Sequence, residues 1–196
     1  MGKIFCLIGK SGSGKDTLFN HLLKRDIPCL EPVVTYTTRP RRANEQEGRE
    51  YHFTDEKTLE ALERDGRVIE KRTYHTVHGD WSYFICETDI KEQNDYMLIG
   101  TPDVVEKLYE RYDEDTVVVI YLELPDNERL LRCIGRESQQ TSPNYSEVCR
   151  RYLADEEDFS ASRIAKYKNI FRVDSSVSVE DVTEKSENII KKFRQL

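Results

Sequence analysis

The sequence predicts an α/β fold in which a parallel sheet is flanked by helices and carries a smaller, mostly antiparallel insertion. Three observations support this prediction. Short, continuous apolar runs alternate with stretches of helical periodicity, as in chains that build parallel sheets. A glycine-rich loop joins the first apolar run to the first helical stretch. Residues 33–86 instead alternate polar with apolar positions, which is typical of a sheet with one face in solvent.

The strands of the parallel sheet are predicted from four apolar runs, whose continuity suits strands buried on both faces. These runs cover residues 4–8, 96–99, 116–122 and 170–173. Helical patterns occupy residues 16–25, 102–112, 125–137, 146–167 and 178–196. Because parallel strands need crossover connections, these helices are expected to flank the sheet.

The inserted unit is predicted to hold four short strands and one helix. The strands are expected at residues 35–39, 51–53, 68–74 and 81–86, and the helix at residues 55–64, ending before Gly66. Further along, residues 138–145 are the most loop-like stretch of the chain, and they separate two predicted helices that both carry arginines.

Composition excludes several functional classes. The chain has 196 residues, which suits one domain, and its 37 acidic and 30 basic residues give a net charge of −7. A general electrostatic attraction to nucleic acid is therefore not expected, although a local basic cluster could hold a small anion. No apolar run is long enough for a membrane span, and residues 4–8 are too short for a signal peptide. Five scattered cysteines without a CxxC spacing indicate reduced thiols and a cytoplasmic protein.

The glycine-rich loop has the context of a phosphate-binding loop, because it follows a buried strand and opens a helix. Its glycines let backbone N–H groups approach phosphates, and the helix N-terminus adds unpaired N–H groups and partial positive charge. Lys15 can reach the terminal phosphates as a point charge, and Thr17 is the best hydroxyl for Mg²⁺. The predicted ATP-binding residues are Gly9, Lys10, Ser11, Gly12, Ser13, Gly14, Lys15, Asp16 and Thr17. A glycine-rich turn that merely starts a helix would not combine all these features.

Three later segments follow in a fixed order: TYTTRPRR at residues 35–42, GREYHF at 48–53 and VIE at 68–70. Together with the loop, they resemble the guanylate kinases, and the resemblance covers almost the whole chain. It implies a P-loop NTPase fold with one domain made of three parts. These are a core (1–32, 87–134 and 152–196), an NMP-binding subdomain (33–86) and a helical lid (135–151).

The resemblance also implies roles for residues of the insertion. It assigns Arg39, Arg42 and Tyr51 to the phosphate of GMP, and Thr35 and Glu70 to the base. The residue chemistry agrees, because guanidinium groups offer forked donors to a phosphate. Guanine presents two parallel donors, N1–H and N2–H, that one carboxylate can accept, whereas adenine presents an acceptor at N1. The alternative for Glu70 is an ordinary exposed strand glutamate.

The predicted lid supplies further positive charge. Arg132 and Arg136 are four residues apart, so they share one helix face, and Arg151 lies on the following helix. They match the Arg-x-x-x-Arg at the start of the family's lid and the arginine on the helix after it, so the resemblance implies that they and Lys15 are the catalytic residues. The chemistry agrees, because phosphoryl transfer depends on positioning and on positive charge around the transferred group. Without the phosphate loop, the two helix arginines would be read as solvent-facing.

The sequence departs from the family at three places. The strand that usually ends in aspartates reads Met-Leu-Ile-Gly-Thr at residues 97–101, so Thr101 is the candidate for a base contact. His78, Gly79 and Asp80 replace a Tyr-Gly-Ser/Thr stretch; His78 could donate to the phosphate and Asp80 could supply the missing acceptor. Asp16 stands where a small residue is usual. These changes leave phosphoryl transfer expected, and they leave a deoxynucleotide or a broader range of purines open as the acceptor.

The leading hypothesis is a kinase that phosphorylates GMP or dGMP with ATP and Mg²⁺. It predicts no nucleic-acid or membrane partner and a monomer or homodimer. One alternative keeps the fold but changes the acceptor, to a broader range of nucleotides or to a ribose bisphosphate. Another is a non-catalytic, peptide-binding module of the same family. The intact phosphate loop argues against the last of these.

Overall fold

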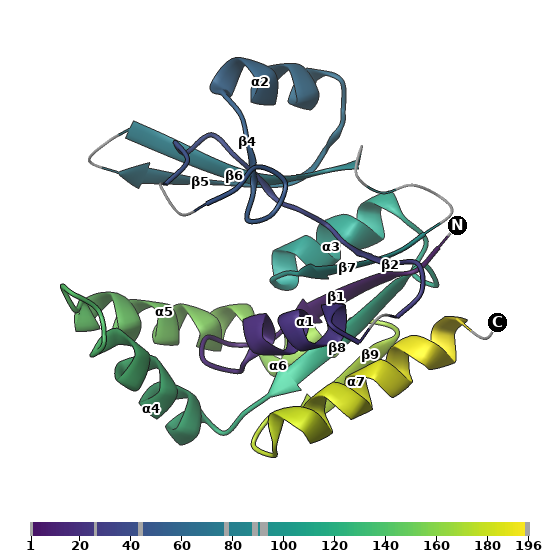
Figure 1. Cartoon of the computed structure of the whole chain (residues 1–196), viewed down its shortest axis with the longest axis vertical. Coiled ribbons are helices and arrows are strands. Elements are labelled where there is room, and N and C mark those ends of the chain that lie inside the picture. The colour runs from purple at the N-terminus through teal and green to yellow at the C-terminus, as the bar shows by residue number, and fades with distance from the viewer. Residues whose placement is uncertain are drawn as a thin grey trace.

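The computed structural model describes residues 2–25, 27–42, 45–76, 79–87, 90 and 94–194. Figure 1 shows two bodies: a larger one built on a five-stranded sheet, and a smaller one built on a four-stranded sheet with its own helix. The chain enters the smaller body from the larger one and returns to it, as expected for an insertion.

The five-stranded sheet is parallel throughout, with the strand order β2-β7-β1-β8-β9. Its strands are β2 (Leu30–Pro32), β7 (Asp95–Ile99), β1 (Ile4–Ile8), β8 (Val117–Glu123) and β9 (Ile170–Asp174). All five residues of the central strand β1 are buried, which explains why its sequence is continuously apolar. The carboxyl ends of the strands share one edge, so the loop after β1 lies at that edge.

Two apolar clusters cover the two faces of this sheet. From β1, Ile4, Cys6 and Ile8 pack toward α3 (Pro102–Arg111) and α6 (Ala161–Ile164). The alternate residues Phe5 and Leu7 pack toward α1 (Lys15–Leu23) and α7 (Val179–Arg194). Because strand side chains alternate between faces, one apolar strand contributes to both layers.

The four-stranded sheet has the order β4-β3-β6-β5. Its strands are β4 (His52–Phe53), β3 (Tyr36–Thr37), β6 (Gly79–Cys86) and β5 (Val68–Thr76). The β3–β6 and β5–β6 pairs are antiparallel and the β3–β4 pair is parallel, so the insertion is mostly antiparallel, as predicted. The helix α2 (Glu56–Arg64) covers one face, with Leu59 buried against Phe84 and Cys86.

Two helices form an arm beside the five-stranded sheet. They are α4 (Asp126–Glu137) and α5 (Tyr145–Asp158), which pack against each other and are joined by residues 138–144 (Figure 1). This arm contains the predicted lid. Among the described residues, no helix combines the length and apolar character that a membrane span requires.

The structure differs at two places from the secondary structure expected from the sequence. The single helix predicted over residues 146–167 is two helices, α5 and α6, because the chain turns at Phe159. The Phe159 ring is buried and stacks on Tyr121 of β8 with 5.7 Å between ring centroids, and that packing outweighs local helical preference. The strand β2 was not predicted; it is short, lies at the sheet edge and pairs only with β7 among the described strands.

Candidate active site

The loop between β1 and α1 takes a conformation that requires glycine. Gly12 and Gly14 have φ angles of 83° and 93°, in the left-handed region that other residues rarely adopt. A Cβ atom on Gly12 would lie 2.7 Å from the backbone oxygen of Arg129 and 2.9 Å from Cys133 Sγ, both on α4. Glycine at this position therefore lets the loop turn and lets α4 pack closely against it.

A cavity of about 460 Å³, here called the loop cavity, opens beside this turn. It is lined by Ser11, Gly12, Gly14, Lys15, Asp16, Thr17, Arg132, Arg136 and Arg151. The structure thus gathers the lysine of the loop and the three lid arginines around the N-terminus of α1. Four cationic side chains and a helix N-terminus make this cavity suited to a polyanion.

The other predicted loop residues lie around this cavity rather than in its wall. Gly9 lines a neighbouring cavity. Lys10 Nζ lies 2.7 Å from Glu156 Oε1 and 3.5 Å from Asp126 Oδ1, so it ties the loop to both helices of the arm. The Ser13 hydroxyl is buried and has no hydrogen-bond partner among the described residues.

Lys15 is held against its own loop. Its Nζ donates to the backbone oxygens of Gly9, at 2.7 Å, and Lys10, at 3.3 Å. Burial lowers the pKa of this amine from its ordinary value, because the charged form loses its water. A phosphate would give the ammonium group a stronger acceptor than either carbonyl.

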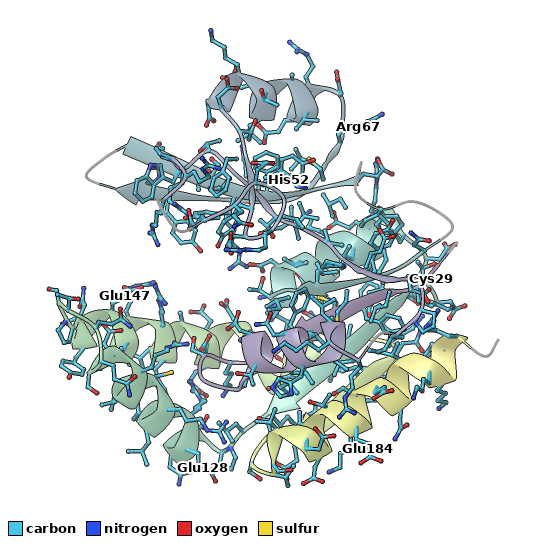
Figure 2. The ribbon with its side chains drawn as sticks, in the orientation of Figure 1. Cys29, His52, Arg67, Glu128, Glu147 and Glu184 are labelled. Carbon is cyan, nitrogen blue, oxygen red and sulfur yellow. The ribbon has the colours of Figure 1, made fainter. Side chains whose placement is uncertain are left out.

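The lid arginines have exchangeable partners. Arg132 Nη2 donates to the backbone oxygen of Ser175 at 3.2 Å, and Arg151 Nε donates to Glu147 Oε1 at 2.7 Å. Glu147 also accepts two hydrogen bonds from Arg150, and these arginine contacts lower its pKa to about 2. Figure 2 shows Glu147 on the side of α5 that faces the smaller body. Arg151 lines the loop cavity and also a cavity bordered by residues of the smaller body.

A second cavity, of about 580 Å³ and here called the sheet cavity, lies between the four-stranded sheet and the core. It is lined by Lys15, Thr35, Tyr51, Glu70, Arg72, Tyr74, Trp81, Tyr83, Ile85, Ile99, Gly100, Thr101, Val104 and Arg151. Four predicted acceptor-site residues are among them: Thr35, Tyr51, Glu70 and Thr101. Lys15 and Arg151 border both cavities, so the two cavities meet at these cations.

Glu70 is the acidic side chain of the sheet cavity, and 11% of its surface is exposed. Burial raises the pKa of its carboxyl group, while the neighbouring Arg72 lowers it in part. Arg72 Nε donates to Glu70 Oε1 at 2.9 Å. Arg72 also donates to Thr101 Oγ1 and Asp103 Oδ2, which lie at the start of α3.

Arg72 was not identified from the sequence. A signal was present, because Arg72 is two residues after Glu70 on one strand and therefore shares its face. Its contacts with Thr101 and Asp103, however, span 29 and 31 residues of sequence, which no local pattern reveals.

Arg39 and Arg42 are not among the residues that line the sheet cavity. Arg39 is 4% exposed, and its guanidinium donates to both Glu45 oxygens, at 2.7 and 3.1 Å, and to the Tyr83 hydroxyl, at 3.1 Å. The backbone N–H of Arg42 donates to the same carboxylate. Because Tyr83 is a wall residue, Arg39 lies directly behind the cavity. Glu45 occupies the fork that a phosphate would use.

The stretch that departs from the family pattern lies elsewhere. His78 lies outside the described residues. Gly79 and Asp80 begin β6, and the Asp80 carboxylate lies 2.7 Å from His75 Nδ1 in an exposed pair. Among the described residues, neither Gly79 nor Asp80 lines the sheet cavity, so the structure does not bring Asp80 to Glu70.

Comparisons with known proteins agree with this geometry. A family model described as guanylate kinase matches residues 1–164. The chain is 28% identical to a guanylate kinase of Cupriavidus pinatubonensis over 197 residues, covering 98% of this chain and 84% of that one. It is 31% identical to a guanylate kinase of Ralstonia nicotianae over 173 residues, covering 85% and 72% respectively.

A solved structure gives the same result for the fold. The crystal structure of guanylate kinase from Anaplasma phagocytophilum matches with a TM-score of 0.60 at 23% identity, covering 97% of this chain and 85% of that one. This likeness confirms the predicted fold class. With the family model covering most of the sequence, the chain belongs to the guanylate kinase family, the nucleoside monophosphate kinases that phosphorylate GMP with ATP.

Proposed function

We propose that this chain performs its family's reaction across the two cavities. ATP places its phosphates in the loop cavity, and GMP or dGMP binds in the sheet cavity with its phosphate toward the loop. The observation that carries this assignment is that Lys15 and Arg151 border both cavities. A phosphoryl group passing from one cavity to the other would travel beside these two cations.

The chemistry required of the protein is positioning and charge. Phosphoryl transfer passes through a loose transition state whose negative charge is spread over the phosphoryl oxygens. Lys15, Arg132, Arg136 and Arg151 supply positive charge there, and the N-terminus of α1 adds backbone donors. No general base is needed, because the acceptor phosphate is already an anion at neutral pH.

The loop cavity also suits a magnesium ion that arrives with ATP. Thr17 and Asp16 line it and offer oxygen atoms, which Mg²⁺ prefers. The described residues contain no group of three or more metal-binding side chains, so the phosphates would supply most ligands. When bound, the ion neutralises charge on the phosphates. Thr17 is the side chain that we assign to hold it.

The phosphoryl acceptor, GMP or dGMP, is held through its base and through its phosphate. Glu70 accepts the N1–H and N2–H groups of guanine, and Thr35 lies in the same wall. Tyr51 faces the cavity and donates its hydroxyl to the acceptor phosphate. Arg39 and Arg42 join it once Glu45 releases the Arg39 fork, which a doubly charged phosphate can replace.

The test is ADP formation from ATP and Mg²⁺ with each nucleoside monophosphate and with ribose bisphosphate. The wild type is expected to use GMP or dGMP in preference to AMP, CMP and UMP. In Glu70→Gln, kcat/KM for GMP should fall roughly tenfold to a hundredfold, because one charge-assisted acceptor is lost. The matched control is Glu63→Gln, which changes a glutamate outside the sheet cavity and should leave the preference intact.

Two results would overturn the proposal. Turnover of ribose bisphosphate without turnover of GMP would move the function to the other acceptor class. An unchanged preference for GMP in Glu70→Gln would remove Glu70 from the base site.

A further inference from the structure

We propose that Arg72 is a specificity-determining residue that donates a hydrogen bond to the 6-oxo group of guanine. Arg72 and Glu70 would then read adjacent positions on one edge of the base. This inference rests on the proposed function, because it concerns the base held in the sheet cavity.

The guanidinium of Arg72 is fixed in place by three contacts. Nε donates to Glu70 on the same strand, and Nη2 donates to Thr101 and Asp103 at the start of α3. A planar group held from two directions by different elements has little freedom to rotate. Arg72 is therefore a preorganised part of the cavity wall rather than a mobile surface side chain.

Two of its five N–H donors remain available. Nε and Nη2 use three donors, and the two on Nη1 have no hydrogen-bond partner among the described residues. The side chain is 32% exposed and lines the sheet cavity together with Glu70. A charged donor that loses water to a bound ligand costs free energy unless the ligand supplies an acceptor.

Guanine supplies that acceptor beside the groups that Glu70 reads. Along one edge, guanine presents the O6 acceptor, the N1–H donor and the N2–H donor. A partner must therefore present one donor followed by two acceptors, which an arginine beside a carboxylate can do. Adenine presents a donor at N6 and an acceptor at N1, so both contacts would be mismatched. Arginine donation to guanine O6 is a frequent contact in nucleic-acid recognition.

The same contacts indicate which groups stand in for the aspartates that usually end this strand in the family. Asp103 lies two residues beyond Thr101, and its other oxygen accepts from Arg163. Burial raises the pKa of Asp103, but Arg163 and Arg72 outweigh it and the net pKa is lowered. The carboxylate is thus an anion that holds Arg72. Thr101 and Asp103 act as positioning residues, and Arg72 makes the base contact.

The experiment compares GMP with two analogues in the full-length enzyme. 6-Thio-GMP weakens the acceptor at position 6, and IMP removes the N2 amine. The wild type should prefer GMP to 6-thio-GMP roughly tenfold or more in kcat/KM, the size of a charge-assisted hydrogen bond. In Arg72→Met the preference for GMP over 6-thio-GMP should fall to the value that the larger size of sulfur alone would cause. The preference for GMP over IMP, which reports on Glu70, should change much less.

Three further variants make the outcome decisive. Arg72→Lys restores a charged donor and should recover part of the discrimination at position 6. Glu70→Gln should reduce discrimination against IMP more than against 6-thio-GMP. Lys71→Met changes a neighbour that contacts Glu63 instead of the sheet cavity, and it should leave both preferences unchanged. Measurable turnover of IMP shows that a variant is folded.

The proposal is wrong if Arg72→Met keeps the full preference for GMP over 6-thio-GMP. It is also wrong if both preferences fall together, because Arg72 would then only position Glu70. Failure of the wild type to phosphorylate GMP would instead remove the proposed function, and this inference with it. The two failures are therefore separate observations.

Discussion

At the scale of single residues, the sheet cavity depends on the balance between burial and pairing at Glu70. Burial raises the pKa of its carboxyl group, and the Arg72 contact offsets part of that rise. Only the ionised carboxylate can accept two N–H groups from the base. In the proposed base site, the burial that strengthens a contact with guanine therefore also makes that contact sensitive to acid.

This balance predicts a pH dependence of GMP binding. Because the pKa of Glu70 lies above its ordinary value of 4.5, protonation begins at a higher pH than for an exposed glutamate. The KM for GMP should rise as the pH falls toward that pKa, because the protonated group loses acceptor capacity. The measurement is KM for GMP from about pH 8 to about pH 5 in wild type and Glu70→Gln.

The Glu70→Gln variant distinguishes the titration of Glu70 from the titration of the substrate. The phosphate of GMP also titrates, near roughly pH 6, and that part of the profile should persist in Glu70→Gln. The difference between the two profiles isolates the carboxyl group. Superimposable profiles would mean that Glu70 does not bind the base as a carboxylate.

At the scale of elements, two of the arginines of α4, Arg129 and Arg132, have different tasks. Arg129 is fully buried, stacks 3.7 Å from the Tyr152 ring centroid of α5, and forms ion pairs with Asp126, Asp155 and Glu156. Asp155 also accepts the backbone N–H of Ser11 at 2.7 Å. This cluster connects the loop to both helices of the arm. Arg132, on the same helix, is largely exposed beside the loop cavity.

The two arginines should respond differently to the same substitution. Arg129→Met should lower the free energy of unfolding by about 3 kcal/mol, because it removes the buried cation that pairs with the partly buried Asp155 carboxylate. Arg132→Met should change it by less than about 0.5 kcal/mol but reduce kcat roughly 10²- to 10³-fold. Urea unfolding and steady-state kinetics on both variants provide the measurement. Equal effects on stability would contradict this division of tasks.

At the scale of the whole molecule, the two cavities belong to different parts of the fold. The loop cavity is formed by the core and the arm, whereas the sheet cavity is formed by the insertion and the core, with Arg151 of the arm at its border. The two cavities are therefore lined by largely separate elements, and the wall residues that they share are Lys15 and Arg151. A ligand that binds only the folded state stabilises it by an amount that grows with the logarithm of the ratio of its concentration to its Kd.

Thermal unfolding should report the two sites independently. A non-hydrolysable ATP analogue or GMP, at about 100 times its Kd, should each raise Tm by roughly 5–10 °C. At the same GMP concentration, Glu70→Gln should lose about half or more of the shift with GMP and keep the shift with the ATP analogue. Loss of both shifts in this variant would indicate that the two cavities do not bind separately.

Sequence patterns were sufficient to predict those parts of the fold and the site that depend on neighbouring residues in the chain. The central strand is continuously apolar because both its faces are covered, and the loop after it needs glycines because its backbone is left-handed. Glu70 was assigned to the base from the family resemblance and from the chemistry of guanine, and the structure places it in the wall of the sheet cavity. By contrast, the break between α5 and α6 depends on Phe159 stacking on a distant strand, which periodicity does not report.

The sequence by itself therefore determined the parallel core, the insertion and the cationic groups available for a phosphate. Only the tertiary structure decided which of them meet. It joined Lys15 and Arg151 between two cavities, placed Arg39 behind the cavity wall against Glu45, and left Asp80 away from Glu70. It also brought Arg72 into the sheet cavity beside Glu70. The physical reason is that backbone periodicity is local, whereas the partners of a charged side chain are set by packing between elements far apart in sequence.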